Sequence, residues 1–230
     1  MKQKLIIFDF ADTLAIQSPT KEELLHNFIL HEMGINISIS KIKEVYYYSC
    51  NIFSHSLTNI KNKEERKDFY NRYNNSILAL LGLSHITTSD KLFNYFCESK
   101  QKWVLKDSVK PLLNDLKHNG YLISLISNFD NNLIQILDNL DIKHLFDSTF
   151  ISQEVGLKKP DLDFFKLPLK KHNIIAKDTF FIGDSYYLDY LPSNNLGMLS
   201  ILLDENNMFS PTLDINRINN INDCKRIILD

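Results

Sequence analysis

Short apolar runs alternate with helical patterns over much of this chain. The first run, Lys4–Phe8, has almost no polar position and is typical of a strand buried on both faces. Similar runs recur after Trp103, each separated from the next by a helical pattern. Strands that alternate with helices predict an α/β fold with a doubly wound parallel sheet. We expect strands at Lys4–Phe8, Tyr121–Ile126, Ser148–Ile151, Thr179–Ile182 and Met198–Leu203, and helices at Val109–Asn119, Asn131–Leu140 and Leu162–His172.

The segment between the first strand and Trp103 has a different texture. Apolar residues recur there at helical spacing, and no strand-like alternation is visible. Thr20 and Glu23 form a capping-box pattern at the start of the first helix, and Gly34 and Gly82 lie where helices should stop. We therefore predict a small all-helical cap domain over residues 16–103, inserted into an α/β core formed by residues 1–15 and 104–230. Further helices are expected near Ser40–Phe53, Lys63–Leu81 and Ser89–Lys100.

Four local features refine this outline. Pro111 suits the first turn of its helix, whereas Pro168 should kink or break the helix that contains it. Trp103 is expected to pack where the insert rejoins the core. The stretch from Asp204 onward is polar and should be partly irregular.

Composition and charge exclude several classes of partner. The formal net charge is -2, which does not indicate binding to nucleic acid or to an acidic membrane surface. No segment approaches the roughly 20 apolar residues that cross a bilayer. Cys50, Cys97 and Cys224 are odd in number and lack metal-type spacing, so we expect reduced thiols and a cytoplasmic location. The sequence leaves the oligomeric state open.

Polar side chains follow four of the predicted strands. Asp9 ends the first strand, Ser127 and Asn128 follow the second, and Lys159 comes after the third. The fourth is followed by Gly183-Asp184-Ser185 and, five residues after Asp184, by Asp189. Because the carboxyl ends of parallel strands meet at one edge of a sheet, these groups should converge.

This set of side chains suits phosphoryl transfer. Asp9 could attack phosphorus and form an acyl phosphate. Mg²⁺ held by Asp9, the Ala11 carbonyl, Asp184 and Asp189 would offset the repulsion between carboxylate and phosphate. Alternatively, Asp189 could orient the ligands of the metal without binding the metal itself.

Other residues of the set would hold the phosphoryl group. Ser127 and Lys159 would stabilise its spread negative charge, with Asn128 beside them. Ser127 could alternatively be a helix N-cap. Thr13 is expected to orient the group by a hydrogen bond rather than to react.

The order of these motifs resembles the haloacid dehalogenase-like (HAD) hydrolase superfamily. The resemblance runs from Lys4 to about Leu203, and the helical insert corresponds to the family's cap domain. It implies a Rossmannoid core, a nucleophilic Asp9 and a Mg²⁺ cofactor. The segments Ile126-Ser127-Asn128-Phe129-Asp130 and Gly183-Asp184-Ser185-Tyr186-Tyr187-Leu188-Asp189-Tyr190, then Gly197-Met198, resemble its rhythmically-expressed-gene-2-like branch.

The chain departs from the family pattern next to the nucleophile. Phosphatases of the superfamily carry a second aspartate two residues after the first, which protonates the leaving group and then activates water. Here that position is Ala11, and Asp12 stands where a glycine is usual. Neighbouring side chains of an extended chain point in opposite directions, so Asp12 is expected to be poorly aimed as a substitute. Losing a general acid typically costs about 10²–10⁴-fold in rate.

Three functions remain open from the sequence. The first is a Mg²⁺-dependent hydrolase of the phosphatase type that acts on a small phosphorylated metabolite, with impaired or altered acid/base catalysis. The second is cleavage of a carbon–phosphorus or carbon–halogen bond, since those relatives also lack the second aspartate. Phosphonate cleavage uses a cap lysine in the relatives, and Lys41, Lys43 and Lys61 lie in the insert. The third is a non-catalytic protein that binds phosphate.

Overall fold

The chain divides into two compact units. A computed structural model describes residues 3–53, 62–85, 87–210 and 212–229. One unit combines Met1–Ile16 with Trp103–Asp230, and the other is Gln17–Lys102. Lys61, considered above as a cap lysine, lies outside the described residues.

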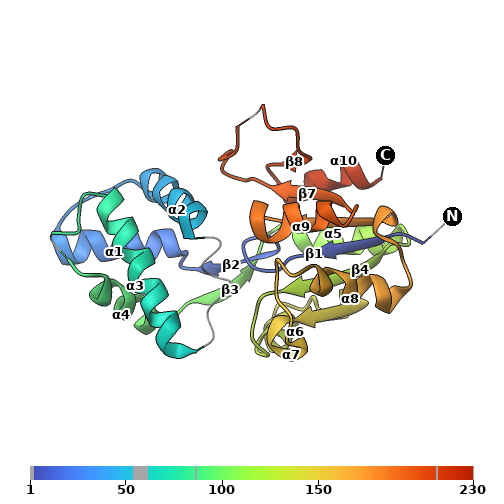
Figure 1. The fold of residues 1–230 in the computed structure, drawn as a ribbon, viewed down its shortest axis with the longest axis horizontal. Helices are drawn as coiled ribbons and strands as arrows, with labels where there is room; N and C mark the ends of the chain where they lie inside the picture. Colours follow the sequence, from blue (N-terminus) through green and yellow to red (C-terminus); the bar gives the residue numbers. More distant parts are fainter. Residues whose placement is uncertain (1–2, 54–61, 86, 211, 230) are drawn as a thin grey trace. The chain divides into compact units, whose positions relative to one another are not determined.

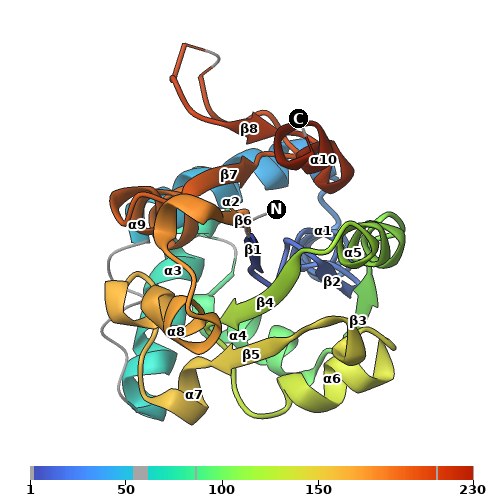
Figure 2. The ribbon, with the colours of Figure 1, turned by 90° about the vertical axis from the view of Figure 1, so that its right-hand side faces the viewer.

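A six-stranded parallel sheet forms the centre of the first unit (Figure 1), and its strands lie in the order β5-β4-β1-β6-β7-β8 (Figure 2). Its first strand has two parallel neighbours, with Ile6 opposite both Ile123 and Phe180. All four residues of β1 are fully buried, as the continuous apolar run predicted. The doubly wound α/β fold is therefore confirmed. The strands are β1 (Leu5–Phe8), β4 (Leu122–Ser127), β5 (Ser148–Ile151), β6 (Thr179–Gly183), β7 (Leu199–Leu203) and β8 (Arg217–Ile218).

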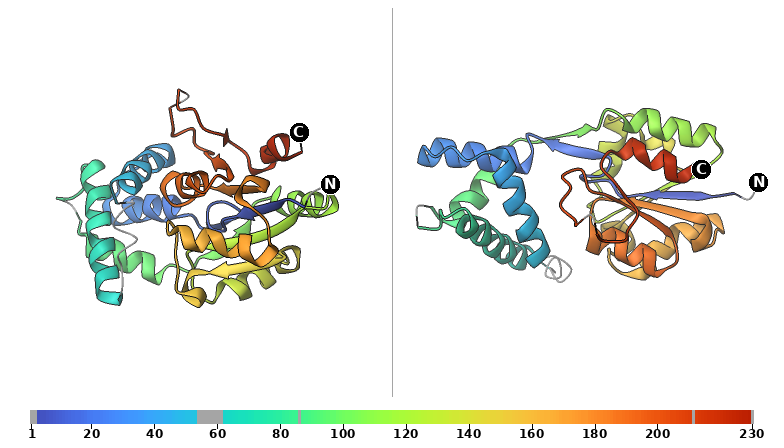
Figure 3. Two further views of the ribbon diagram at one scale, coloured as in Figure 1. Left: turned by 45° about the vertical axis from the view of Figure 1, so that its right-hand side comes forward. Right: turned by 90° about the horizontal axis from the view of Figure 1, so that it is seen from above.

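Helices cover both faces of this sheet (Figure 2). On one face, α5 (Val109–His118), α6 (Leu133–Asn139) and α10 (Cys224–Ile228) pack on strand residues such as Ile6 and Ile123. On the other face, α8 (Leu162–His172) packs Phe164 and Phe165 against the opposite side of the strands. The short helices α7 (Ser152–Val155) and α9 (Leu191–Asn195) lie on that second side as well (Figure 3). The central strands β4, β1 and β6 thus bury both of their faces.

The second unit contains four helices among its described residues: α1 (Lys21–Met33), α2 (Ile39–Phe53), α3 (Lys63–Leu80) and α4 (Ser89–Glu98). They bury a separate apolar cluster that includes Leu25, Ile42 and Ile77. The predicted capping box is present, since the Thr20 side chain accepts from Glu23 N and the Glu23 carboxylate accepts from Thr20 N. Residue 34 ends α1 with φ of 69°, a conformation that favours glycine.

Several elements were not predicted from the sequence. Residues 16–18 and 102–103 were assigned to an all-helical domain, but they belong to β2 (Ala15–Ser18) and β3 (Lys102–Leu105), which form a two-stranded sheet. These strands have only four residues each, too few to show a clear alternation. The helix α7, the strand β8 and the helix α10 were also not predicted, because they are too short to show a helical or strand-like pattern.

Pro168 was expected to kink or break its helix, and the break does not occur. Helix α8 runs from Leu162 to His172 without a break, with Pro168 inside it. A proline removes one hydrogen bond, here to the Phe164 carbonyl, and crowds that carbonyl. Burial of Phe164, Phe165 and Pro168 on the sheet offsets this cost.

Two smaller findings concern the described residues. Cys97 is exposed and Cys224 buried, and both are free thiols. Across the described ranges, we find no helix with the length and apolar character needed to span a membrane.

A polar network lies between the sheet and α8. His172 Nε2 is 2.8 Å from Ser148 Oγ and 3.2 Å from Ser124 Oγ, and the two hydroxyl oxygens are 2.7 Å apart. Burial lowers the pKa of His172, Asp147 opposes this shift, and Lys171 adds to it. The network therefore favours the neutral imidazole.

This network predicts a pH-dependent stability. An imidazole with a lowered pKa binds fewer protons in the folded state than in the unfolded state, so its contribution is present above about pH 6.5 and is lost as the pH falls below that value. In urea unfolding between pH 7.5 and pH 5, we expect His172→Gln to lose less stability on acidification than the parent protein. The exposed His118→Gln should follow the parent. Equal pH dependence of all three proteins would refute this account.

Candidate active site

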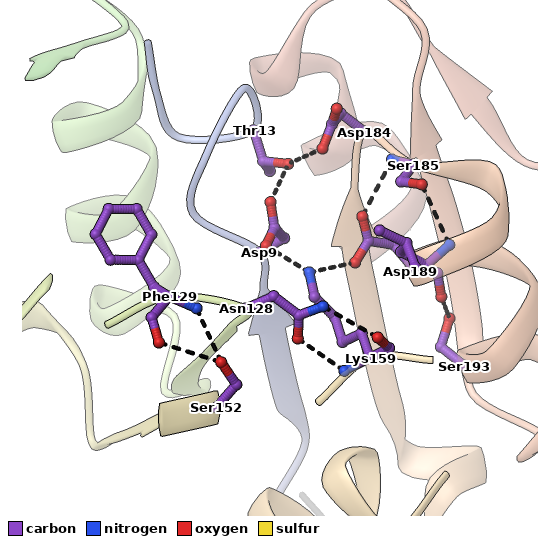
Figure 4. Close-up of polar contacts among 11 residues, drawn as sticks. Asp9, Thr13, Asn128, Phe129, Ser152, Lys159, Asp184, Ser185, Asp189 and Ser193 are labelled. Carbon is purple, nitrogen blue, oxygen red and sulfur yellow. Dashed lines mark hydrogen bonds and ion pairs between the residues drawn. The ribbon is translucent and has the colours of Figure 1, made fainter. Parts of the chain in front are cut away.

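A buried lysine joins two carboxylates at the carboxyl edge of the sheet (Figure 4). Lys159 Nζ is 2.5 Å from Asp9 Oδ1 and 2.6 Å from Asp189 Oδ1. The three residues are only 3%, 5% and 1% exposed, respectively, so these contacts are shielded from solvent. Burial alone would lower the pKa of Lys159, but Asp189 and Asp9 together hold it above its ordinary value. The ammonium is therefore charged.

The loop after β4 positions this lysine. Asn128 Nδ2 donates to the Lys159 carbonyl at 3.0 Å, and Lys159 N donates to Asn128 Oδ1 at 2.7 Å. The Asn128 amide thus holds the backbone of Lys159, and its expected contact with substrate stays a prediction. Ser127, the last residue of β4, is 1% exposed, and its predicted contact with a phosphoryl group also stays a prediction.

Thr13 lies between two of the carboxylates. Its hydroxyl is 3.1 Å from Asp9 Oδ2 and 3.3 Å from Asp184 Oδ1. The side chain is fully buried, which matches an orienting group rather than an exposed nucleophile. The single hydroxyl proton can serve one acceptor at a time, so Thr13 links the nucleophile candidate to the carboxylate after β6.

A π-helical turn, Tyr186–Tyr190, brings Asp189 back toward the sheet. The Ser185 carbonyl accepts from Asp189 N at 3.0 Å and from Tyr190 N at 3.1 Å, while Ser185 N donates to Asp189 Oδ2 at 3.1 Å. Ser193 Oγ donates to the Asp189 carbonyl at 2.6 Å. Such turns are frequent at functional sites. The Asp189 carboxylate is therefore fixed by its own loop as well as by Lys159.

The carboxylates form a group that could hold a cation. One oxygen from each of Asp9, Asp184 and Asp189 lies within 4.8 Å of the others. Burial, followed by the charges of Asp12, Asp9 and Asp189, raises the pKa of Asp184 well above its ordinary value. Burial also raises the pKa of Asp189 to about 6, although Lys159 opposes the shift.

The Lys159 ammonium lies beside the carboxylates of Asp9, Asp184 and Asp189, whose combined negative charge exceeds its own. The candidate metal-ligand atoms are all oxygen atoms. A hard divalent cation such as Mg²⁺ fits this set. The predicted participation of the Ala11 carbonyl stays a prediction. Ala11 lies on the same turn and forms an isolated bridge with Ala15.

The expectation for Asp12 was based on a wrong backbone conformation. Residue 12 has φ of 58°, and the chain turns here because Leu14 N and Ala15 N both donate to the Phe10 carbonyl. The rule for alternating side chains in an extended strand does not apply to this turn. Among the charges that raise the pKa of Asp184, that of Asp12 has the largest effect. Asp12 therefore contributes to the electrostatics of the site.

Two functional neighbours were missed as site residues. Gly183 was noted only as part of a motif, although a Cβ there would lie 2.5 Å from Asp189 Cγ. Lys106 carries no motif at all. Its Nζ donates to the Asp12 carbonyl at 2.5 Å and pairs with Glu205 at 2.9 Å, so it supports the turn after Asp9.

The close approach at Gly183 predicts that Gly183→Ala displaces Asp189. The added methyl group would meet Asp189 Cβ at 2.6 Å as well as its carboxylate. Overpacking of this kind typically costs about 1–3 kcal/mol. We expect a lower midpoint in urea unfolding and, in a crystal structure of the variant, a broken Asp189–Lys159 pair. An unchanged midpoint with the pair intact would contradict this prediction.

Comparisons with known proteins agree with this architecture. Residues 3–197 match the family model of haloacid dehalogenase-like hydrolases. The chain is 24% identical to the haloacid dehalogenase-like hydrolase domain-containing protein 3 of Mus musculus over 217 residues, covering 88% of this chain and 82% of that protein. It is 28% identical to a glyceraldehyde 3-phosphate phosphatase of Pyrococcus furiosus over 211 residues, covering 86% and 79%.

A solved structure supports the fold. The putative HAD-hydrolase YfnB of Bacillus subtilis, bound to magnesium, aligns with a TM-score of 0.67 and 16% identity over 99% of both chains. At this identity the likeness concerns the fold alone. The family model, by contrast, spans most of the sequence, including Asp9, Lys159 and Asp184. This chain belongs to the haloacid dehalogenase-like hydrolase family.

Proposed function

We propose that this protein is a Mg²⁺-dependent hydrolase of the phosphatase type that acts on a small phosphorylated metabolite. The observation that carries the proposal is the buried contact of Lys159 with Asp9 and Asp189 beside Asp184. A carboxylate that is held by a lysine and a threonine, at the edge where ligands bind in α/β sheets, is placed for nucleophilic attack.

Asp9 would react in two steps. One of its carboxylate oxygens attacks phosphorus, and the bond from phosphorus to the leaving oxygen breaks, which leaves an aspartyl phosphate. A water molecule then hydrolyses this acyl phosphate, releases inorganic phosphate and restores the Asp9 carboxylate. Lys159 balances negative charge on the transferring group, because its ammonium already contacts Asp9. Thr13 keeps the Asp9 carboxylate oriented.

Asp9, Asp184, the Ala11 carbonyl and Asp189, directly or through another ligand, would hold Mg²⁺. When bound, this cation offsets the negative charge of the carboxylates and of an incoming phosphate. The excess of buried carboxylates over lysine supports a divalent cation at this site.

The side chain at residue 11 narrows the range of substrates. Ala11 cannot protonate a leaving group. A leaving group that departs without a proton, such as the carboxylate of an acyl phosphate, is therefore preferred over an alkoxide. The relatives named glyceraldehyde 3-phosphate phosphatase support a small phosphorylated substrate class. The likeness to the rhythmically-expressed-gene-2-like branch stays a prediction.

One observation favours a different function. The absence of an acid at Ala11 is also expected of a protein that binds a phosphorylated ligand and does not turn it over. The carboxylates of Asp9, Asp184 and Asp189 are grouped closely enough to hold a metal ion, which argues against a dehalogenase that needs none. For carbon–phosphorus cleavage, Lys41 pairs with Glu44 on an exposed surface, so nothing marks it as the imine-forming lysine.

The nucleophile assignment predicts that Asp9→Asn abolishes turnover. With acetyl phosphate and Mg²⁺, phosphate release should fall to background, because an amide cannot form the acyl phosphate. Asp138→Asn is the matched control, since this exposed carboxylate pairs with Lys143 at the surface. EDTA should stop the parent enzyme and Mg²⁺ should restore it. Full activity of Asp9→Asn would end the proposal.

The missing acid predicts a gain of function in Ala11→Asp. If the rest of the site is competent, the new carboxyl group should raise turnover of an alkyl phosphate by about 10²–10⁴-fold and change acetyl phosphate turnover less. Steady-state rates with both substrates measure this difference. No gain with either substrate would favour the binding protein over the enzyme.

A further inference from the structure

Three aromatic rings gather beside the candidate active site. The ring centroids of Phe10 and Trp103 are 5.0 Å apart, those of Phe10 and Phe129 are 5.8 Å apart, and those of Trp103 and Phe129 are 5.5 Å apart. Each ring therefore contacts the other two, and all three belong to the α/β unit. Their planes are tilted or edge-on, the geometries that aromatic pairs prefer.

Two of the rings are attached to the loops that carry the site. Phe10 directly follows Asp9, and its carbonyl accepts both backbone N–H groups that close the following turn. Phe129 directly follows Asn128, whose amide holds the backbone of Lys159. Ser152 anchors Phe129 further, because the Ser152 hydroxyl donates to the Phe129 carbonyl and Phe129 N donates to Ser152 Oγ, each at 3.1 Å (Figure 4). The ring of Phe129 extends away from these polar groups.

The third ring belongs to the strand that returns from the helical insert. Trp103 lies in β3 and is the first residue of the α/β unit after the insert. Three residues later, Lys106 N donates to the Leu14 carbonyl at 3.1 Å, and its side chain reaches the Asp12 carbonyl. The returning strand is thus attached to the turn after Asp9 by its backbone, by a lysine and by an aromatic ring.

This arrangement is more than general core packing. The polar connection between the Asp9 loop and the Asn128 loop passes through Lys159, which must also face substrate. Beyond the backbone ladder that pairs β1 with β4, the aromatic cluster connects side chains of the same two loops and involves no reacting group. A loop shift of about 1 Å can cost a factor of 10² in rate, so the separation of these loops matters for catalysis.

We propose that Trp103 is a positioning residue: its ring, packed on Phe10 and Phe129, sets the separation of the nucleophile loop from the loop that holds Lys159. This inference rests on the proposed function. It gives the returning strand a role in aligning the reacting groups. Loss of the indole ring should therefore lower kcat more than it raises KM, because alignment matters most in the transition state.

Trp103→Leu tests this role, with Trp103→Phe as the conservative variant. In steady-state assays with acetyl phosphate and Mg²⁺, we expect Trp103→Leu to lower kcat by about 10-fold or more with KM within about 3-fold, and Trp103→Phe to recover most of the loss. Val104→Ala is the matched control, since this neighbouring side chain is 45% exposed. Equal kcat in Trp103→Leu and the parent would overturn the inference, as would a loss that tracks the unfolded fraction in circular dichroism.

A spectroscopic measurement separates failure of this inference from failure of the proposed function. Trp103 is the single tryptophan of the chain, so fluorescence excited at wavelengths that tyrosine does not absorb reports on this cluster. Orthovanadate with Mg²⁺ should change the Trp103 emission of the parent, and Phe129→Leu should reduce that response. If the parent turns over no substrate but shows this pattern, the phosphatase assignment fails and the positioning role stands. If the parent turns over substrate but its emission does not respond, or if Phe129→Leu responds as strongly as the parent, the positioning role is refuted.

Discussion

The structure depends on one buried ammonium group shared by two buried carboxylates. Transferring any of these charges from water to the protein interior is costly, and mutual pairing offsets that cost only when all partners are present. Removing one partner of such a pair typically costs on the order of 3–5 kcal/mol, because a charge is left buried without compensation. Asp9, Lys159 and Asp189 are far apart in sequence, and the sheet edge must bring them together before any of them can be buried. The fold and the chemistry of the site therefore share one requirement.

The backbone meets this requirement at three strand ends. Asp9 continues the ladder of β1, since its N–H donates to the Ile182 carbonyl at 3.0 Å. The loop after β4 holds Lys159 through the Asn128 amide, and the π-helical turn after β6 carries Asp189 back to the ammonium. Residue 183 must be glycine because Asp189 occupies the place of a side chain there. The parallel strands bring these residues to one edge of the sheet, and the hydrogen bonds of the following turns then hold the side chains in contact.

The sequence was sufficient for the features that repeat or extend over many residues. Apolar runs such as Leu5–Phe8 predict buried strands, and the parallel arrangement then brings Asp9, Lys159 and Asp184 to one edge. Features that depend on the conformation of a single turn could not be predicted from the sequence. The left-handed backbone at residue 12 contradicts an extended-chain argument, because Asp can occupy a place that usually favours glycine. Pro168 lies inside a continuous helix because burial of its neighbours outweighs the local preference of proline. Lys106 has no motif, since only the folded chain brings it to the Asp12 carbonyl.

The same turn explains how the site differs from a complete acid/base pair. Ala11 offers no proton donor, while Asp12 contributes the largest charge effect on Asp184. The turn thus adds negative charge near the grouped carboxylates of Asp9, Asp184 and Asp189, although it carries no side chain that could protonate a leaving oxygen. The Asp12 carboxylate adds to the negative charge that a cation would offset, and Lys106 stabilises the turn by donating a hydrogen bond to the Asp12 carbonyl. Nucleophilic attack needs the aligned Asp9 and a neutralised phosphate, whereas departure of the leaving group needs a proton only when that group is a strong base. Under the proposed function, such a site would retain nucleophilic attack by Asp9 and would depend on the substrate for a leaving group that departs without a proton.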